Sequence, residues 1–410
     1  MNEKTAESAT ALTSLIGPSE VFLREYWNTR PMVHHTGLAE EWQRMLSLDE
    51  LDFILAYRCL REPYVRVSMN GAPVHEKRYM RPHAVNGTPV RGVLDVDKLA
   101  MEFASNASIL LDSIDRYLPA VKRLCQGVGA ALRGPAEAVV FLTPGGVRGL
   151  SPHFDSTEVF VLQIYGSKRW KVFDQIRPLP ASGRVLRPDE VSKPALEVRT
   201  QPGDCLYVPW GCPHVAVSAE STSCHISIQV RPPTWGELIE NLIESALKPE
   251  EYEPVDLFSA SSAEIPVGQA ELRLRAATNR LVSCDLGEFI DGRIAAQDPV
   301  PASRAGFLQQ IASSAGLLPG SRVSRNKRMT ECEIGSLGED RVQLKVESLT
   351  LAYPARALGT LTALLDADDK PVSEFAAELG LDATLKLVRH LVANSVLISS
   401  DGSRAEEEGR

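Results

Sequence analysis

The stretch that decides the fold is GLSPHFDSTEVFVLQIYGSKRWKVFD, residues 149–174. It places His153 and Asp155 two residues apart, before an apolar run that predicts a strand. Side chains two apart on an extended chain point to the same face, so both can reach one metal ion. The best candidate for a further ligand is His214, within QPGDCLYVPWGCPHVAVS, residues 201–218. Two histidines and one carboxylate leave coordination positions open, which suits non-haem Fe(II) working with O₂.

Lys168 is the next candidate, because it begins a strand directly after the turn at Gly166. Strand alternation puts Lys168 and Trp170 on one face. A cation facing a barrel interior would be costly unless an anion met it, and a dicarboxylate co-substrate would supply that anion. The spacing alone leaves the alternative open, which is a solvated basic end of a strand.

Residues 138–230 predict a β domain. Short apolar runs alternate there with Gly and Pro turns, and no amphipathic helix intervenes, a pattern typical of a sandwich or barrel. The flanking segments have helical spacing. We expect helices over 20–27, 46–60, 94–133 with a break near Pro119, 235–247, 269–280 and 304–315. Ser47 and Glu50 form a capping-box pattern at the start of the second of these.

The two ends of the chain differ in character. Residues 1–18 are small and polar, and we expect them to fray. Near the C-terminus, a strand-like stretch (341–354) and a helix (357–365) precede a predicted helix, a turn at Gly380, a second helix and a β-rich end. This order of predicted helices and strands is typical of a winged-helix domain. An acidic linker (249–264) and the EEEGR tail complete the chain.

Composition narrows the class of protein. The 410 residues carry 44% apolar and 24% charged side chains, as ordinary globular proteins do. A net charge of −9 argues against non-specific binding to phosphate backbones. The seven cysteines are scattered and lack CxxC spacing, so we expect reduced thiols in a cytoplasmic protein. We expect no signal peptide and no membrane span. A zinc cluster of Cys205, Cys212 and His214 would lack a fourth ligand.

Four stretches together resemble a known family. FLREYWNTRPMV (22–33), FLTPGGVRGLSPHFDSTEVFVLQIYGSKRWKVF (141–173), QPGDCLYVPWGCPHVAVS (201–218) and the C-terminal block are similar to JmjC-type Fe(II)/2-oxoglutarate oxygenases. The resemblance is to the ribosomal-oxygenase branch of these cupin-like hydroxylases. It implies an α+β fold with a double-stranded β-helix (cupin, jelly-roll) core, a helical middle region and a C-terminal winged helix. The expected divisions are 1–135 (helical and β support), 136–234 (core), 235–320 (helical, with a dimer interface) and 321–410 (winged helix and tail).

The resemblance also assigns residues. It implies that His153, Asp155 and His214 bind Fe(II), and that Lys168 holds the distal carboxylate of 2-oxoglutarate. Where relatives often carry Asn and Tyr, on the strand before the HxD pair, this chain has Val139 and Phe141. The candidate substitutes for these lost polar groups are Thr143, Ser151 and Ser227.

The implied reaction is hydroxylation of an unactivated C–H bond in a polypeptide side chain, with a ribosomal protein as the favoured target and a homodimer as the assembly. One alternative applies the same chemistry to a biosynthetic precursor peptide or small molecule. Another is a non-catalytic cupin and winged-helix sensor that regulates transcription. Residues 340–410 carry twelve acidic and eight basic side chains, a net of −4, whereas a DNA reader should carry a basic face. We therefore expect no direct binding to nucleic acid.

Overall fold

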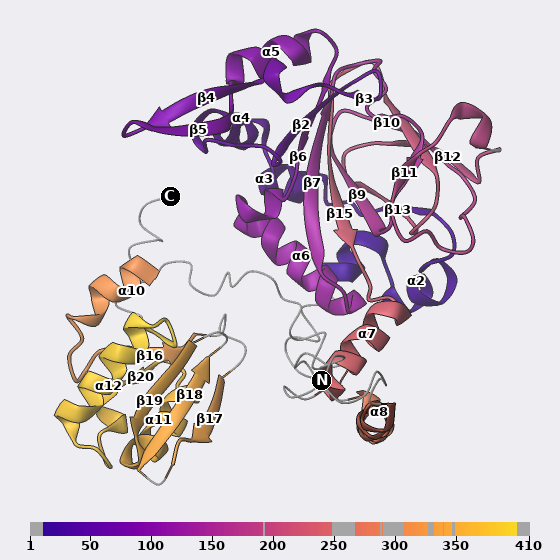
Figure 1. Ribbon diagram of the computed structural model, residues 1–410. Helices are drawn as coiled ribbons and strands as arrows, with labels where there is room; N and C mark the ends of the chain where they lie inside the picture. The colour runs from indigo at the N-terminus through magenta and orange to yellow at the C-terminus, as the bar shows by residue number, and fades with distance from the viewer. Residues whose placement is uncertain are drawn as a thin grey trace. The chain divides into compact units, whose positions relative to one another are not determined.

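The computed structural model describes residues 11–191, 193–247, 267–287, 289, 307–326, 332–338, 340–346 and 349–399. Backbone packing divides the chain into two compact units, 1–299 and 300–410. The first contains the two largest sheets, and the second contains two small ones (Figure 1). The expected acidic linker and the C-terminal tail lie outside the described residues. The four-part division made from the sequence stays a prediction.

The first unit is built on two antiparallel sheets, with strand orders β1-β13-β9-β15-β7-β6-β2-β3 and β11-β8-β14-β10-β12. The larger contains β1 (Met32–His35), β2 (Val65–Met69), β3 (Ala72–Pro73), β6 (Ser108–Leu111), β7 (Ala136–Thr143), β9 (Glu158–Tyr165), β13 (Asp204–Val208) and β15 (Ser223–Val230). The smaller contains β8 (His153–Phe154), β10 (Lys168–Val172), β11 (Arg184–Val185), β12 (Leu196–Thr200) and β14 (His214–Ser218). The β character predicted for 138–230 is confirmed.

Strand β9 explains how the two faces of the larger sheet are used. Its residues are buried on both faces up to Ile164, because alternate apolar side chains enter different clusters. Phe160, Leu162 and Ile164 belong to the main core, shared with the helices. Val159 and Val161 belong to a second cluster that includes residues of the smaller sheet. The space between the sheets is therefore walled by apolar side chains.

Helices cover the outer face of the larger sheet. They are α2 (Ser19–Glu25), α3 (Ala39–Met45), α4 (Leu48–Tyr57), α5 (Val96–Ala104) and α6 (Pro119–Leu132). In Figure 1, α6 runs across this sheet below β7, and its residues Val121 and Val128 are fully buried in the core. The predicted capping box is present at α4, where the backbone N–H of Glu50 donates to Ser47 Oγ at 3.1 Å. Beyond the sheets lie the β4 (Met80–Val85) and β5 (Thr88–Leu94) ribbon, α7 (Trp235–Ala246) and α8 (Val267–Val282).

Two expectations for the first unit were wrong. The helix expected over 94–133 is interrupted by β6, whose four residues are all buried between β2 and β7. Sheet pairing outweighs helical spacing in so short an apolar run. The expectation that residues 1–18 fray is wrong for residues 11–18, the part of this segment that the structure describes. Residues 11–16 are helical, and Leu12, Leu15 and Ile16 are buried in the main core.

The second unit contains three-stranded sheets β20-β16-β21 and β17-β18-β19. Its elements are α10 (Phe307–Ser314), β16 (Arg322–Arg325), β17 (Cys332–Ser336), β18 (Arg341–Val346), β19 (Leu349–Pro354), α11 (Leu358–Leu365), β20 (Lys370–Pro371), α12 (Leu381–Ala393) and β21 (Leu397–Ser399). The helix expected before Gly380 is instead one 3₁₀ turn, Val372–Phe375. The stretch between Pro371 and Gly380 is too short for a stable helix of its own. Within the described residues, every helix of the chain is too short or too polar to cross a membrane.

The buried N-terminal helix gives a stability prediction. Leu15 is fully buried, so Leu15→Ala should lower the free energy of unfolding by about 3 kcal/mol through lost burial and a residual cavity. Thr13→Ala, at an exposed position of the same helix, should change it by less than about 0.5 kcal/mol. Urea-induced unfolding followed by circular dichroism measures both. Equal, small effects would mean that this helix does not pack on the core.

Candidate active site

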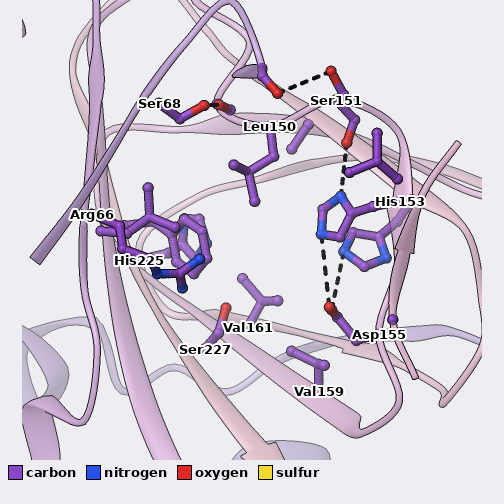
Figure 2. A pocket seen from close by; sticks show the side chains of 18 of the residues that line it. Arg66, Ser68, Leu150, Ser151, His153, Asp155, Val159, Val161, His225 and Ser227 are labelled. Carbon is purple, nitrogen blue, oxygen red and sulfur yellow. Dashed lines mark hydrogen bonds and ion pairs between the residues drawn. The ribbon is translucent and has the colours of Figure 1, made fainter. Parts of the chain in front are cut away.

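A cavity of about 440 Å³ lies between the two sheets of the first unit. The larger sheet contributes Val161, His225 and Ser227 to its wall, and the smaller sheet contributes Lys168 and His214. Figure 2 shows His225 and Ser227 on one side of this space, with His153 and Asp155 on the opposite side. The residues that the sequence singled out separately therefore share one enclosure.

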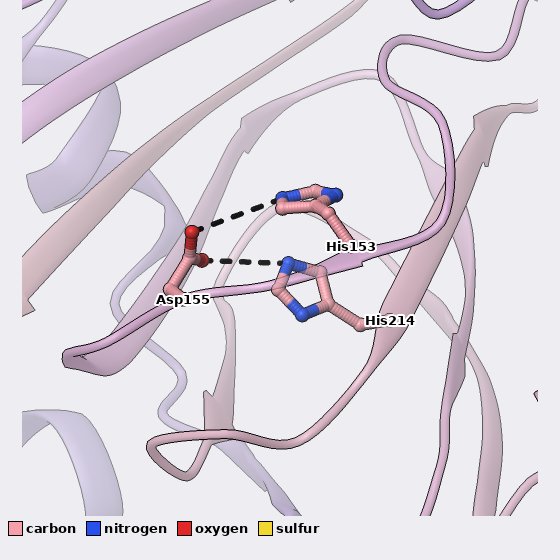
Figure 3. Close-up of side chains that lie close together, drawn as sticks. All are labelled: His153, Asp155 and His214. Carbon is pink, nitrogen blue, oxygen red and sulfur yellow. Dashed lines mark ion pairs between the residues drawn. The ribbon is translucent and has the colours of Figure 1, made fainter. Parts of the chain in front are cut away.

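The three expected metal ligands converge at one end of the cavity. Strands β8 and β14 pair so that His153 lies directly opposite His214, and Asp155 follows β8. His153 Nε2 is 4.0 Å from Asp155 Oδ1, and His214 Nε2 is 3.6 Å from Asp155 Oδ2 (Figure 3). One donor atom from each residue lies within 4.8 Å of the other two. A single ion between them could bind all three.

Backbone carbonyl groups fix the orientation of both imidazoles. His153 Nδ1 lies 2.8 Å from the carbonyl oxygen of Ser151, and His214 Nδ1 lies 3.1 Å from that of Cys212. A carbonyl can only accept, so the proton sits on Nδ1 and the Nε2 lone pair faces the ligand point. Burial, and then the neighbouring His153, lowers the pKa of His214 to about 4. Neutral imidazoles are the form that binds a metal.

This donor set fits Fe(II) better than zinc. Two imidazoles and one carboxylate, with further positions open toward a cavity, suit non-haem iron. Among the described residues, neither Cys205 nor Cys212 belongs to a group of potential ligands. Burial raises the pKa of the Cys212 thiol to about 12, which disfavours the thiolate that zinc requires. The zinc cluster is thus not formed.

A buried carboxyl group supports the loop that leads to His214. The Glu158 carboxylate accepts hydrogen bonds from the Tyr207 hydroxyl and from the backbone N–H of Trp210, at 3.2 Å for the latter. The next backbone N–H, of Gly211, donates to the carbonyl of Asp155 at 2.9 Å. Glu158 therefore ties the two ligand-bearing segments together. The available signal in the sequence was a carboxylate at the head of an otherwise apolar strand.

Lys168 lies at another part of the cavity wall and is almost completely buried. Its Nζ donates to Thr143 Oγ1 at 3.0 Å and lies 3.4 Å from His225 Nδ1. Within the described part of the chain, no carboxylate comes within ion-pair distance of it. Burial lowers the pKa of Lys168 to about 7. A buried cation without a counter-ion is costly, and an anion in the cavity would relieve that cost.

The structure also shows a polar cradle beside Lys168 that the sequence did not reveal. A Cβ on Gly149 would lie 3.4 Å from Thr143 Oγ1 and 3.7 Å from both Lys168 Nζ and Ser108 Oγ. Glycine therefore leaves room where three polar groups converge. Ser108 Oγ is buried and finds no hydrogen-bond partner among the described residues, which is unusual unless a ligand supplies one. The cradle fits one carboxylate of a small dicarboxylate.

The candidate substitutes for the missing polar groups have different surroundings. Thr143 contacts Lys168, and Ser227 lines the cavity. Ser151 also lines it, but its hydroxyl donates to the carbonyl of Gly71 at 3.1 Å. Phe141 lines the cavity and stacks on His225, with ring centroids 4.7 Å apart. Roles for these serine and threonine side chains in binding 2-oxoglutarate stay predictions.

Fold and site together define a class, namely a two-sheet cupin-type protein with a two-histidine, one-carboxylate metal centre in the space between its sheets. Comparison with known proteins agrees. Residues 115–238 match the model of the JmjC domain. The chain is 28% identical over 236 residues to NO66 of Aedes aegypti, a "bifunctional lysine-specific demethylase and histidyl-hydroxylase". It is 26% identical over 240 residues to ribosomal oxygenase 2 of Bos taurus.

These matches cover 56% of this chain, but only 36% of the first relative and 50% of the second. The crystal structure of ycfD from E. coli has the same fold, with a TM-score of 0.50 and 16% identity over 94% of this chain and 99% of that one. Residues 115–238 therefore carry a JmjC domain, and the chain is similar to ribosomal oxygenases, as the sequence resemblance predicted.

The buried carboxyl group predicts a pH-dependent stability. Burial raises the pKa of Glu158 from 4.5 to about 7, so the folded protein holds a proton that the unfolded chain releases between these values. Stability should therefore fall as pH rises through this window. Glu158→Gln keeps an acceptor for Tyr207 and Trp210 and removes the titration. Its stability relative to the wild type should rise by up to about 3 kcal/mol between pH 5 and pH 8.

Urea unfolding at the two pH values measures this difference. Glu137→Gln, at an exposed position of β7, is the matched control and should follow the wild type at both. If the free energy of unfolding changed equally with pH in Glu158→Gln and in the wild type, Glu158 would not titrate in this range.

Proposed function

We propose that this protein is an Fe(II)- and 2-oxoglutarate-dependent oxygenase that hydroxylates an unactivated C–H bond of a polypeptide side chain. The observation that carries the proposal is one cavity that holds both the His153, Asp155 and His214 set and the buried, uncompensated Lys168. A metal ligand set alone fits many functions. A buried cation without a carboxylate partner among the described residues, in the same enclosure, calls for an anionic co-substrate beside the metal.

Each residue has a defined task in this proposal. His153, Asp155 and His214 hold Fe(II), which supplies the redox chemistry with O₂ that the protein side chains lack. Lys168 holds the distal carboxylate of 2-oxoglutarate and thereby orients the keto acid end toward the metal. Apolar walls such as Val161 keep water from the reacting groups. Ser151 and Cys212 keep the imidazoles in the ligand tautomer through their carbonyl groups.

A polypeptide substrate is supported by the relatives, whose names describe a histidyl-hydroxylase and a ribosomal oxygenase. A ribosomal protein suits the net charge of −9, because such targets are basic. Phe141, stacked on His225 where relatives often carry Tyr, keeps a second candidate open, namely the same chemistry on a precursor peptide or small molecule.

The finer architectural expectations also belong to this proposal. The two facing sheets support the proposal of a double-stranded β-helix, and α11, α12 and the β20-β16-β21 sheet support that of a winged helix. The exposed side chains Trp235, Ile239 and Ile243 form one stripe along α7, which supports the homodimer. A cytoplasmic location completes the proposal.

Turnover tests the enzyme proposal directly. Protein loaded anaerobically with Fe(II) should convert 2-oxoglutarate to succinate. Ribosomal protein extract should stimulate this turnover, and a protein of the extract should gain the mass of one oxygen atom. His153→Ala should abolish both turnover and Fe(II) binding, measured by calorimetry. His83→Ala, at an exposed histidine of β4, should change neither.

Each outcome separates the candidates. Turnover without stimulation by the extract would favour a peptide or small-molecule substrate. Binding of Fe(II) and 2-oxoglutarate without any succinate would favour the non-catalytic sensor. Absence of both binding and turnover would refute the proposal.

Lys168 predicts how affinity for 2-oxoglutarate varies with pH. With a pKa of about 7, Lys168 must take up a proton to meet the anion at higher pH. The dissociation constant should therefore rise by up to about tenfold per pH unit above pH 7. Lys168→Met should weaken binding by at least about tenfold and remove this pH dependence. Lys171→Met, on the exposed face of the same strand, should leave both unchanged in calorimetric titrations. A pH dependence that survives in Lys168→Met would assign it to another group.

A further inference from the structure

A group of arginines without carboxylate partners lies on and beside the β4–β5 ribbon. Its members, all exposed, are Arg58, Arg61, Arg81 and Arg91. Within the described residues, none of the four forms an ion pair. Their neighbour Arg66 differs, because both of its guanidinium contacts to the Asp112 carboxylate measure 2.6 Å. These four side chains are cationic, whereas the whole chain carries a net charge of −9.

Strand register places two of these guanidinium groups on the same face. Arg61 and Arg81 both lie directly opposite Val93, one on each side. Side chains that lie opposite each other in antiparallel pairs point to the same face. The nearest carboxylate in sequence belongs to Glu62, which lies on the other face. A Cβ built on Gly92, the residue before Val93, would lie 3.6 Å from the Cβ of Glu62. The two arginines therefore share a surface from which Glu62 points away.

Two exposed aromatic rings lie on α4, the helix that precedes Arg61 in the chain. Phe53 and Tyr57 lie one turn apart on α4, are 49% and 71% exposed, and have ring centroids 5.1 Å apart. The guanidinium of Arg58 lies 5.1 Å from the Phe53 ring centre. The backbone N–H of Leu94, in β5, donates to the carbonyl oxygen of Leu60 at 2.8 Å and holds the chain after α4 against the ribbon. Tyr57 and Arg61 are four residues apart, so their Cα atoms lie within roughly 14 Å.

We infer that this surface binds single-stranded nucleic acid. The planar guanidinium groups of Arg61 and Arg81 suit phosphate oxygens, and Tyr57 and Phe53 offer faces on which unpaired bases stack. The carboxylates of an acidic peptide would satisfy the arginines alone, whereas a nucleic acid strand would use both the arginines and the exposed rings. The inference does not rest on the proposed oxygenase activity.

The surface also lies close to the cavity. Strand β4 begins directly after Tyr79, which lines the cavity wall. Arg81 is two residues further along the chain, roughly 7 Å from Tyr79 at the spacing of an extended strand. A nucleic acid strand bound here would lie beside the proposed catalytic site rather than in it, since neither Arg61 nor Arg81 lines the cavity.

Fluorescence anisotropy of the full chain with a labelled single-stranded RNA of about 16 nucleotides tests the inference. Arg61→Gln/Arg81→Gln should weaken binding by about tenfold or more at low salt. It should also reduce the slope of log affinity against log salt by about 1.4, the value for two phosphate contacts on a single strand. Tyr57→Ala should weaken binding by about tenfold through lost stacking.

The matched control is Arg116→Gln/Arg123→Gln, which removes the same charge from exposed positions elsewhere and should leave binding unchanged. A single-stranded DNA of the same sequence should bind through the same groups, whereas a duplex should bind at least tenfold more weakly. Thermal melting establishes that each variant is folded. Arg61→Gln/Arg81→Gln should also retain the wild-type level of 2-oxoglutarate turnover, whatever that level is.

Three results would overturn the inference. The first is no binding of the RNA at low salt, and the second is an equal loss of binding in the control variant. The third is equal binding of duplex or of poly-glutamate with no effect of Tyr57→Ala, which would assign the surface to a generic polyanion or an acidic protein. Failure of the succinate assay would count against the oxygenase and leave this inference untouched.

Discussion

The contact on which the site depends is the antiparallel pairing of β8 with β14, which sets His153 opposite His214. The same sheet also fixes the place of Lys168. Strand β10 lies on the other side of β14, with Val172 opposite His214 and Lys168 opposite Ser218. Because Lys168 and Val172 are four residues apart, they share a face and lie roughly 13 Å apart along the strand. One register therefore determines both where a metal can bind and where an anion can bind, so a slip by one residue would remove the two together.

This arrangement buries two ionisable groups, Glu158 and Lys168, and their surroundings in the protein differ. Glu158 is compensated within the protein, by the Tyr207 hydroxyl and the Trp210 backbone N–H. Lys168 has a hydroxyl, a neutral imidazole and the rings of Phe141 and Trp170 beside it, but no carboxylate among the described residues, so its charge remains partly uncompensated. Strongly shifted pKa values in a cavity are typical of functional sites. The contrast separates a buried carboxyl group with hydrogen-bond donors beside it from a buried amine that has no carboxylate partner among the described residues.

The sequence predicted the parts of the site that depend on local spacing. Strand geometry places His153 and Asp155 on one face, and four consecutive residues indicate the Ser47 capping box. For Lys168 the spacing left a solvated strand end open, and the family resemblance supplied the role. Gly149 and Ser108 were missed because their role arises only when β6 enters the sheet beside β7, and the apolar spacing around Ser108 indicated a helix. Leu15 was missed for a related reason. A short helix in a polar stretch is stabilised by the core it meets, which local composition does not show.

Net charge describes the whole surface of the chain, whereas the proposed nucleic-acid surface depends on local charge. Electrostatic interactions at the surface are screened beyond roughly 8–10 Å at physiological ionic strength, so a bound strand responds to the few charges nearest to it. A total of −9 over 410 residues says little about a surface where two guanidinium groups share one face. Strand register decides that local charge, because it directs Arg61 and Arg81 to one side and Glu62 to the other. An acidic chain can therefore carry a site for phosphate without any contradiction between the two charges.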